Sequence, residues 1–245
     1  MAITGVLFDF SGTLMRIESP EEWLRGGLAE LGAGPELLPD GDLGAAAARL
    51  ARAGAQPGGP APERVPDHLS ALWDHRDRSA DEHRAAYTGL SRQVELGSDA
   101  LHDVLYERHM TPAAWRPYPD TAEVLRTLRE RGVRVAVVSN IGWDLRPVLR
   151  AHGLERWTDT SVLSYEHGVQ KPDPRLFALA CERIGVGPEA ALMVGDDRRA
   201  DGAPPRSAAR CTSWTTCPWI SGPAACCRCW SWRRGWLRTR SPRPR

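Results

Sequence analysis

The apolar positions divide the chain into stretches with different periods. A short apolar run at residues 3–8 ends at Asp9 and is followed by a glycine turn, a pattern typical of a buried parallel strand. Between residues 16 and 115 the apolar positions recur at helical spacing, as at Leu24 and Leu28, and no strand pattern is found. The rest of the chain, up to about residue 203, alternates between the two periods, which indicates alternating helices and strands.

This alternating stretch predicts the core of the protein. We expect strands over residues 133–138, 160–164 and 190–194, and helices over residues 121–131, 144–152 and 173–184. Strands that alternate with helices form parallel sheets with right-handed crossovers. The sequence therefore predicts an α/β fold with a Rossmann-like parallel sheet, interrupted after its first strand by a helical cap. We assign residues 1–15 and 116–203 to the core and residues 16–115 to the cap.

Polar side chains follow each of the four predicted strands. In an open parallel sheet the ligand lies beyond the carboxyl ends of the strands, so these side chains are expected to meet there. They are Asp9, Ser11 and Thr13 after the first strand, Ser139 and Asn140 after the second, Lys171 past the third, and Asp196, Asp197 and Asp201 after the fourth. Carboxylates beside one lysine and a small hydroxyl suit a hard cation such as Mg²⁺ together with a phosphate group. Taken singly, each of these residues also suits an ordinary turn or helix cap.

Four short motifs resemble those of the haloacid dehalogenase-like (HAD) hydrolase superfamily. They are DFSGTL, VVSN, QKPDP and VGDDRRAD, in this order, and the resemblance extends from residue 3 to about residue 203. An isolated D-x-x-G-T motif is common, but four motifs in order, each near a strand end, are specific. The resemblance implies a hydrolase with this α/β core and an inserted helical cap.

The resemblance also implies roles for the residues at the strand ends. Asp9 is expected to be the nucleophile of a covalent aspartyl intermediate, and Ser11 to occupy the position of the catalytic acid. Binding of the substrate's phosphoryl group is expected from Thr13, Ser139, Asn140 and Lys171. Mg²⁺ is expected as the cofactor, with ligands from Asp9, the Ser11 carbonyl, Asp196, Asp197 and Asp201. Either Asp197 or Asp201 is expected to complete the metal shell or to orient Lys171.

One position departs from the superfamily's phosphatases. These enzymes carry a second aspartate two residues after the nucleophile, which protonates the leaving oxygen and then activates water. Here that residue is Ser11, whose hydroxyl is a poor acid at neutral pH. The expected activity is a Mg²⁺-dependent phosphatase of a small phosphorylated metabolite. The alternatives are a metal-independent dehalogenase that uses Asp9, and a degraded enzyme.

Net charge and the length of the apolar runs indicate which partners and which location to expect. The 245 residues carry 32 basic and 31 acidic groups, but nine arginines and no acidic residue follow residue 203, so the preceding part has a net charge of −8. An acidic body does not favour nucleic acid as a partner. Apolar runs are too short for a membrane helix, and the first one has no basic leader, so we expect a cytoplasmic protein. The oligomeric state is not indicated. The cap histidines His68, His75 and His83 are expected to be solvated.

Residues 204–245 do not continue the pattern of the core. They contain five of the six cysteines and five of the ten tryptophans, without a sustained apolar period. One interpretation is a basic arm for nucleic acid or membrane, and the other is a frameshifted reading frame, which we favour. The segment is therefore not expected to form a folded domain, and the last strand of the core sheet is expected to be missing.

Overall fold

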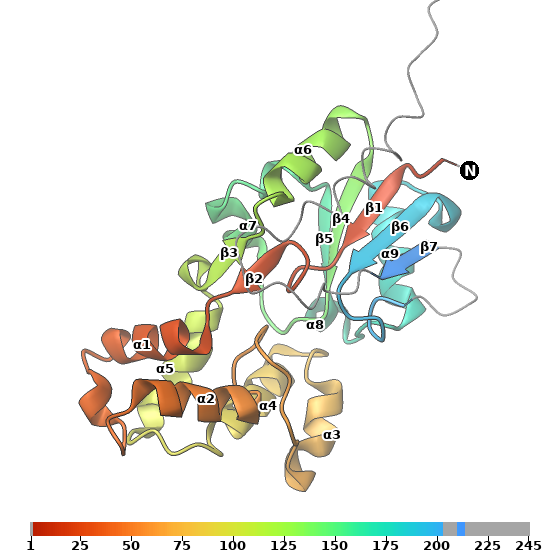
Figure 1. Ribbon diagram of the computed structural model, residues 1–245. Coiled ribbons are helices and arrows are strands. Elements are labelled where there is room, and N and C mark those ends of the chain that lie inside the picture. Colours follow the sequence, from red (N-terminus) through yellow and green to blue (C-terminus); the bar gives the residue numbers. More distant parts are fainter. Residues whose placement is uncertain (1, 203–209, 214–245) are drawn as a thin grey trace, which may run out of the picture. The chain divides into compact units, whose positions relative to one another are not determined.

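A five-stranded parallel sheet forms the centre of the core in the computed structural model, which describes residues 2–202 and 210–213 (Figure 1). Its order is β5-β4-β1-β6-β7. The strands are β1 (Gly5–Phe8), β4 (Arg134–Ser139), β5 (Thr160–Leu163), β6 (Ala191–Gly195) and β7 (Arg210–Ser213). All neighbouring pairs are parallel, and Leu7 of β1 pairs with Ala136 on one side and Met193 on the other. The predicted α/β fold with a parallel sheet is confirmed.

Helices cover the sheet and bury its apolar strands. The core helices are α6 (Thr121–Glu130), α7 (Arg146–Ala151), α8 (Ser164–His167) and α9 (Pro174–Ile184). The buried side chains Phe177 and Ile184 of α9 belong to the same hydrophobic cluster as Leu7 and Val138 of the sheet. Because β1 is the central strand, its carboxyl end is held on both sides by neighbouring strands. The central position of β1 therefore fixes the place of Asp9, the residue that follows it.

Five helices form the cap between the first and second core strands. They are α1 (Pro20–Glu30), α2 (Leu43–Ala53), α3 (Asp67–His75), α4 (Ala80–Ser91) and α5 (Asp99–His109). Figure 1 shows them on the side of the sheet toward which the strands point. The cap has its own apolar core around Trp23, Leu50 and Leu101, and the Trp23 indole N–H donates to the carbonyl of Leu105 at 2.9 Å. Whatever binds at the strand ends therefore lies beneath the cap.

Short elements complete the described chain. Single turns of 3₁₀ helix occur at Pro35–Leu37, Pro112–Ala114, Glu155–Trp157 and Pro188–Ala190. The antiparallel strands β2 (Met15–Ile17) and β3 (Trp115–Pro117) pair at the two ends of the cap insertion. The expectation of no strand after residue 16 is wrong for this ribbon. Three residues are too few to show an alternating pattern, and their pairing joins segments far apart in the sequence.

Strand β7 corrects the expectation that the last core strand is missing. Its backbone pairs in parallel with β6, from Leu192 opposite Arg210 to Gly195 opposite Ser213. The edge of β6 presents unpaired backbone groups, and an extended segment of four residues satisfies them without needing an apolar period of its own. The rest of the predicted tail, residues 204–209 and 214–245, lies outside the described residues.

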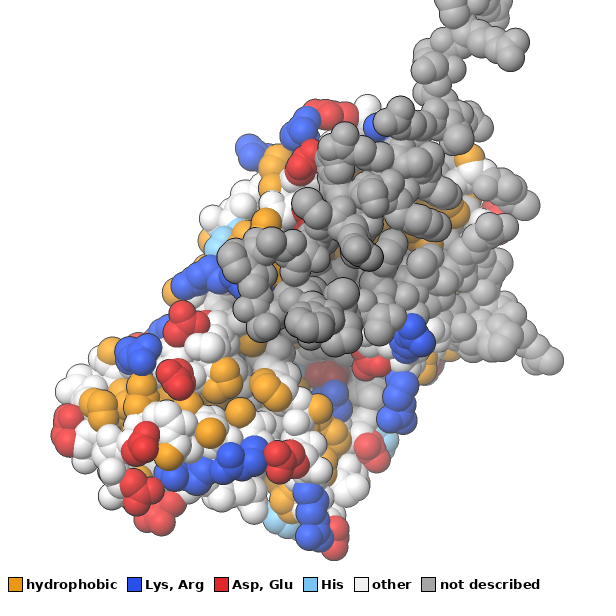
Figure 2. Space-filling view, in the orientation of Figure 1, with side chains coloured by type: hydrophobic (Ala, Val, Ile, Leu, Met, Phe, Trp, Pro, Cys, Tyr) orange, Lys and Arg blue, Asp and Glu red, His pale blue; other side chains and the backbone are white. Residues whose placement is uncertain are grey.

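The surface of the cap carries charges of both signs. Figure 2 shows basic and acidic side chains interspersed over the visible face of the cap. Many of them form ion pairs, such as Arg49 with Asp40 and Arg84 with Glu107. Mixed charge of this kind is typical of a solvated surface. Within residues 2–202 and 210–213, no helix has the length and hydropathy needed to cross a bilayer.

Candidate active site

Asp9 lies at the centre of the carboxyl edge of the sheet. It follows β1 directly, its backbone N–H donates to the carbonyl of Val194 at 2.9 Å, and it is buried. The next residue, Phe10, is fully buried and packs on Trp115 with ring centroids 4.7 Å apart. Gly12 then adopts a φ of +76°, which turns the chain back toward β2. This turn leaves the Asp9 carboxylate facing the cap side of the sheet.

Lys171 joins Asp9 to the fourth motif. Its Nζ lies 2.9 Å from Asp9 Oδ1 and 2.6 Å from Asp201 Oδ1, and the whole side chain is buried. Burial disfavours the charged ammonium group, but the two carboxylates outweigh burial and raise the pKa of Lys171. Lys171 is therefore a fixed positive charge between two aspartates, one that follows β1 and one that follows β6.

The side chain of Asn140 holds the backbone of Lys171. Its Nδ2 donates to the Lys171 carbonyl at 3.0 Å, and its Oδ1 accepts from the Lys171 N–H at 2.6 Å. Nearby, the Ser164 hydroxyl donates to the carbonyl of Ile141 at 3.0 Å and accepts from its N–H at 2.9 Å. Asn140 was predicted to bind substrate, and in the structure both ends of its amide position the loop that carries Lys171.

Three carboxylates gather beside Lys171. Oxygen atoms of Asp9, Asp196 and Asp201 lie within 4.8 Å of one another. Burial, reinforced by the negative charge of Asp9, raises the pKa of Asp196 to about 7. The group thus holds more negative charge than one lysine offsets. Oxygen ligands at this spacing fit a small divalent cation such as Mg²⁺.

The absence of a side chain at Gly12 makes room for this group. A Cβ atom at Gly12 would lie 2.1 Å from Asp196 Oδ2. Glycine at this position therefore does two things. It permits the positive φ angle, and it lets the Asp196 carboxylate approach the backbone of the turn after Asp9.

Asp197 does not join the carboxylate group. Its side chain is exposed, and Oδ1 accepts the backbone N–H groups of Arg199 at 2.8 Å and Ala200 at 3.3 Å. The backbone N–H of Asp201 donates to the Asp197 carbonyl at 2.7 Å. Of the two alternatives, Asp201 is the residue that contacts Lys171, whereas Asp197, predicted as a metal ligand, lies outside the group of three carboxylates. The Asp197 side chain instead stabilises the turn that delivers Asp201.

Three of the predicted site residues carry hydroxyl groups. Ser139 is the buried last residue of β4. The Oγ1 atom of Thr13 is buried and has no hydrogen-bond partner among the described residues. Ser11 is half-buried, and a Cβ atom at Gly58 of the cap would lie 3.1 Å from its Oγ. The cap thus reaches to the position where a catalytic acid was expected.

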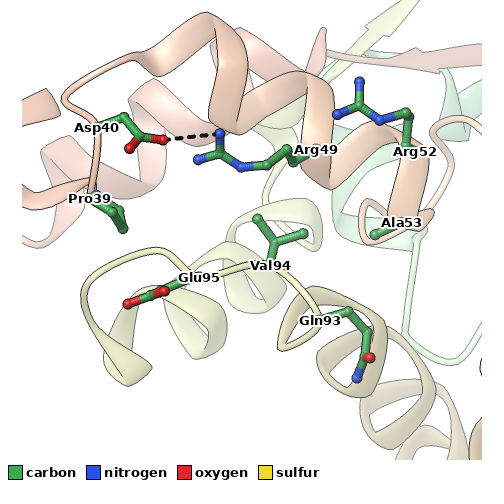
Figure 3. Close-up of a pocket in the computed structure, with 8 residues that line it drawn as sticks. All are labelled: Pro39, Asp40, Arg49, Arg52, Ala53, Gln93, Val94 and Glu95. Carbon is green, nitrogen blue, oxygen red and sulfur yellow. Dashed lines mark hydrogen bonds and ion pairs between the residues drawn. The ribbon is translucent and has the colours of Figure 1, made fainter.

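Two pockets differ in their relation to these residues. A pocket of about 300 Å³ lies beside the glycine turn that follows Asp9, and its lining includes Gly12, Arg16, Gly58 and Tyr118. A pocket of about 530 Å³ lies between α2 and the segment around Glu95, where Arg49 is paired with Asp40 (Figure 3). All residues lining the larger pocket belong to the cap and none to the four motifs. The smaller pocket is therefore the one that adjoins the candidate site.

Sequence reasoning missed the part of the cap that faces the core. His83 of α4 is buried rather than solvated, and a Cβ atom at Gly142, just after β4, would lie 2.1 Å from His83 Cβ. His83 Nδ1 lies 2.8 Å from the hydroxyl of Tyr106. The spacing of His83 and Tyr87, one helical turn apart, is the only signal that places the histidine on the inner face of α4.

Comparisons with known proteins agree with this geometry. A profile of the haloacid dehalogenase-like hydrolases matches residues 3–208. A phosphoserine phosphatase from Thermus thermophilus is 34% identical over 144 residues, which are 54% of this chain and 57% of that enzyme. The (S)-2-haloacid dehalogenase 4A from Burkholderia cepacia is 39% identical over 143 residues, which are 53% of this chain and 62% of that enzyme. The chain spans less than two thirds of the length of these curated relatives.

Solved structures show the same fold. The crystal structure of a dehalogenase with an intermediate complex has a TM-score of 0.61 at 22% identity and covers 88% of this chain and 86% of its own. At this identity the likeness concerns the fold alone. The profile match covers most of the chain and all four motifs. The chain is therefore a hydrolase that belongs to the haloacid dehalogenase-like family.

Proposed function

We propose that the protein is a Mg²⁺-dependent phosphatase of a small phosphorylated metabolite, with Asp9 as its nucleophile. The observation that carries this proposal is the group of carboxylates formed by Asp9, Asp196 and Asp201, within 4.8 Å of one another. A single lysine ammonium offsets only part of their charge, so the site favours a divalent cation. When bound by these carboxylates, Mg²⁺ supplies positive charge that offsets the charge of the phosphoryl oxygens.

The residues of the site account for the first step. The Asp9 carboxylate attacks phosphorus, the bond from phosphorus to the leaving oxygen breaks, and an aspartyl phosphate forms on Asp9. Lys171 fixes the orientation of the Asp9 carboxylate through the 2.9 Å contact. An ammonium group has three N–H donors, and Asp9 and Asp201 accept two of them. The third donor, together with the unpartnered Thr13 hydroxyl, is suited to the oxygens of the transferring group.

The second step regenerates the enzyme. Water attacks phosphorus of the aspartyl phosphate, the bond from phosphorus to the Asp9 oxygen breaks, and inorganic phosphate leaves. Asp201 holds Lys171 at 2.6 Å throughout, so the ammonium group stays in place when the charge on Asp9 is lost and recovered. Asn140 supports the same arrangement from the backbone side.

A dehalogenase is the second candidate, and Ser11 is the observation that favours it. Displacement of a halide by Asp9 needs no proton donor, so a serine at this position carries no penalty there. The similarity to a haloacid dehalogenase fits this candidate. A metal-independent reaction does not account for Asp196, whose carboxylate adds negative charge beside Asp9 and Asp201 beyond what the Lys171 ammonium offsets. We therefore favour the phosphatase.

Two parallel assays separate the candidates. Phosphate release from 4-nitrophenyl phosphate is measured with Mg²⁺ and after metal removal with EDTA, and halide release is measured from (S)-2-chloropropionate. The proposal predicts phosphate release that falls at least about 100-fold without metal, since the cation contributes several kcal/mol of charge stabilisation. Halide release without metal would establish the dehalogenase instead. Neither activity in a folded preparation would indicate a degraded enzyme.

A further inference from the structure

Asp77 is a buried carboxylate that the mechanism above does not use. It lies in the turn between α3 and α4, and only 3% of its surface is exposed. Its nearest cationic group is the guanidinium of Arg76, with Nε 3.5 Å from Oδ2. His83 Nε2 lies 3.9 Å from Oδ1, and burial holds the pKa of His83 well below its ordinary value, so this imidazole is neutral. Within the described residues, the Asp77 carboxylate therefore has one charged neighbour on the cap.

The turn that carries Asp77 rests on the two loops that build the active site. The Gln170 side chain, beside Lys171, donates to the carbonyl of Asp74 at 2.7 Å. On the other side, His83 fills the space left by Gly142 in the loop after Ser139 and Asn140. Figure 1 shows α3 and α4 on the same side of the sheet as α8, in agreement with these contacts. These contacts hold the turn that carries Asp77 over the loops at the strand ends, as a roof of the site.

The proposed reaction needs a proton donor for the leaving oxygen, and none of the residues described so far supplies one. Ser11 occupies the usual position of the acid and cannot perform its role at neutral pH. Asp196 and Asp201 belong to the carboxylate group beside Lys171, and the Asp197 carboxylate stabilises a turn. We propose that Asp77 is the general acid of the phosphatase reaction, an inference that rests on the function proposed above.

The proton balance of this assignment is simple. As Asp9 attacks phosphorus, the Asp77 carboxyl gives its proton to the leaving oxygen, and the alcohol departs neutral. Water then attacks the aspartyl phosphate and gives one proton back to the Asp77 carboxylate. The products are hydrogen phosphate and the free carboxylate of Asp9, so each turnover returns both aspartates to their starting states.

The electrostatic surroundings support a proton on Asp77. Burial raises the pKa of Asp77, opposed by the charges of Arg76 and Lys171 and reinforced by the negative charge of Asp9. Its electrostatic neighbours are Arg76 on its own turn, His83 and Tyr87 of α4, Tyr106 of α5, and Lys171 and Asp9 of the core. A carboxyl whose pKa is raised holds its proton more readily than a free one, which suits it to act as an acid and then as a base.

The test compares leaving groups in the full-length chain. Asp77→Asn should lower turnover of an alkyl phosphate such as glycerol 3-phosphate by about 100-fold, within the usual range for general acid catalysis. Turnover of 4-nitrophenyl phosphate, whose leaving group needs little protonation, should change less than about threefold. Adding Ser11→Asp to Asp77→Asn should recover alkyl phosphate turnover by at least about 10-fold. The matched control is Asp81→Asn, an exposed aspartate of α4, the helix that follows the same turn, which should leave both rates unchanged.

A second measurement on the parent chain does not depend on folding of a variant. The ratio of alkyl to aryl turnover should fall as the pH rises through the titration of Asp77, because only the alkyl reaction needs its proton. Equal losses for both substrates in Asp77→Asn, or a ratio that does not change with pH, would overturn the assignment. A parent chain without Asp9-dependent turnover of the aryl phosphate would overturn the proposed function itself, and this inference with it.

Discussion

At the scale of single residues, Lys171 connects the parts of the site that come from different motifs. It is the only lysine of the chain and is buried between Asp9 and Asp201. A buried pair that loses one partner leaves an uncompensated charge, which costs more than the pair itself contributes. The lysine therefore stabilises the fold and also holds the Asp9 carboxylate in place.

Replacing this lysine by methionine tests both roles. Lys171→Met should lower the free energy of unfolding by about 3 to 5 kcal/mol in the absence of metal, because two buried carboxylates lose their counter-charge. Added Mg²⁺ should recover part of this loss, and activity should be abolished. Urea denaturation with and without Mg²⁺ measures the effect. A loss below about 1 kcal/mol would mean that the aspartates do not depend on the lysine.

Gly12 offers a test of the carboxylate group with a matched control. Gly12 and Gly32 have φ angles of +76° and +68°, but a Cβ at Gly12 meets Asp196 whereas nothing lies within 4 Å of one at Gly32. Both alanine variants should lose about 1 to 2 kcal/mol from backbone strain. Only Gly12→Ala should also raise the Mg²⁺ concentration needed for half-maximal activity, measured by metal titration. Equal metal requirements in the two variants would place the cation elsewhere.

The sequence predicted which side chains meet at the strand ends better than it predicted the residues that position them. Asp9, Lys171 and Asp201 follow strand ends, and the geometry of parallel sheets brings strand ends together. The contact of Asn140 with the Lys171 backbone was not predicted, because it depends on a loop conformation that no spacing encodes. Asp77 was not predicted, since the packing of the cap on the core decides where it lies.

At the scale of elements, the long periodic segments were predictable and the short ones were not. The helix expected over residues 173–184 is α9, and its N-cap Asp173 accepts from Arg175 N at 2.9 Å. The four-residue helix α8 and the strands β2 and β3 are too short to show a period. β7 depends on the edge that β6 offers rather than on its own sequence.

The cap is tied to the β2 strand by a buried ion pair, which gives a prediction at this scale. Arg108 of α5 donates to both carboxylate oxygens of Glu18 at 2.7 Å, and the Glu18 side chain is buried. Arg108→Met should cost about 3 to 5 kcal/mol by leaving Glu18 unpaired, and adding Glu18→Met should recover much of that loss. Urea denaturation of the four proteins of this cycle gives the coupling energy.

A surface pair serves as the control for that cycle. The exposed pair of Arg126 and Glu130 on α6 has its atoms 2.6 Å apart but should couple by less than about 0.5 kcal/mol, because water and salt screen it. If Glu18 and Arg108 couple no more strongly than this pair, the buried contact does not hold the cap in place.

At the scale of the whole molecule, cap and core meet in a cluster of buried rings. His109 stacks on His83 at 5.5 Å and lies edge-on to Trp143 of the core at 5.5 Å. Burial lowers the pKa of His109 to about 3 and holds that of His83 well below its ordinary value. The cap therefore packs on the core with its histidines neutral, which links the stability of the fold to pH.

The sign of this link follows from proton binding. Below about pH 6.5 the unfolded chain protonates His109 while the folded chain does not, so stability is complete above this pH and falls as the pH decreases. Between pH 7.5 and 5.5 the parent should lose about 1.4 kcal/mol more than His109→Phe, which has no proton to bind. Urea denaturation at both pH values, with Mg²⁺ present, gives the difference. Equal losses would show that His109 is protonated in the folded protein.

The central claim is that Asp9 is the nucleophile of a metal-dependent phosphatase. The most direct measurement is the rate of Mg²⁺-dependent phosphate release from 4-nitrophenyl phosphate by the parent, by Asp9→Asn, and by Asp144→Asn as an exposed control. Loss of a covalent nucleophile should lower turnover by about 1,000-fold or more in Asp9→Asn, whereas Asp144→Asn should retain the parental rate. Turnover by Asp9→Asn equal to that of the parent would contradict the account.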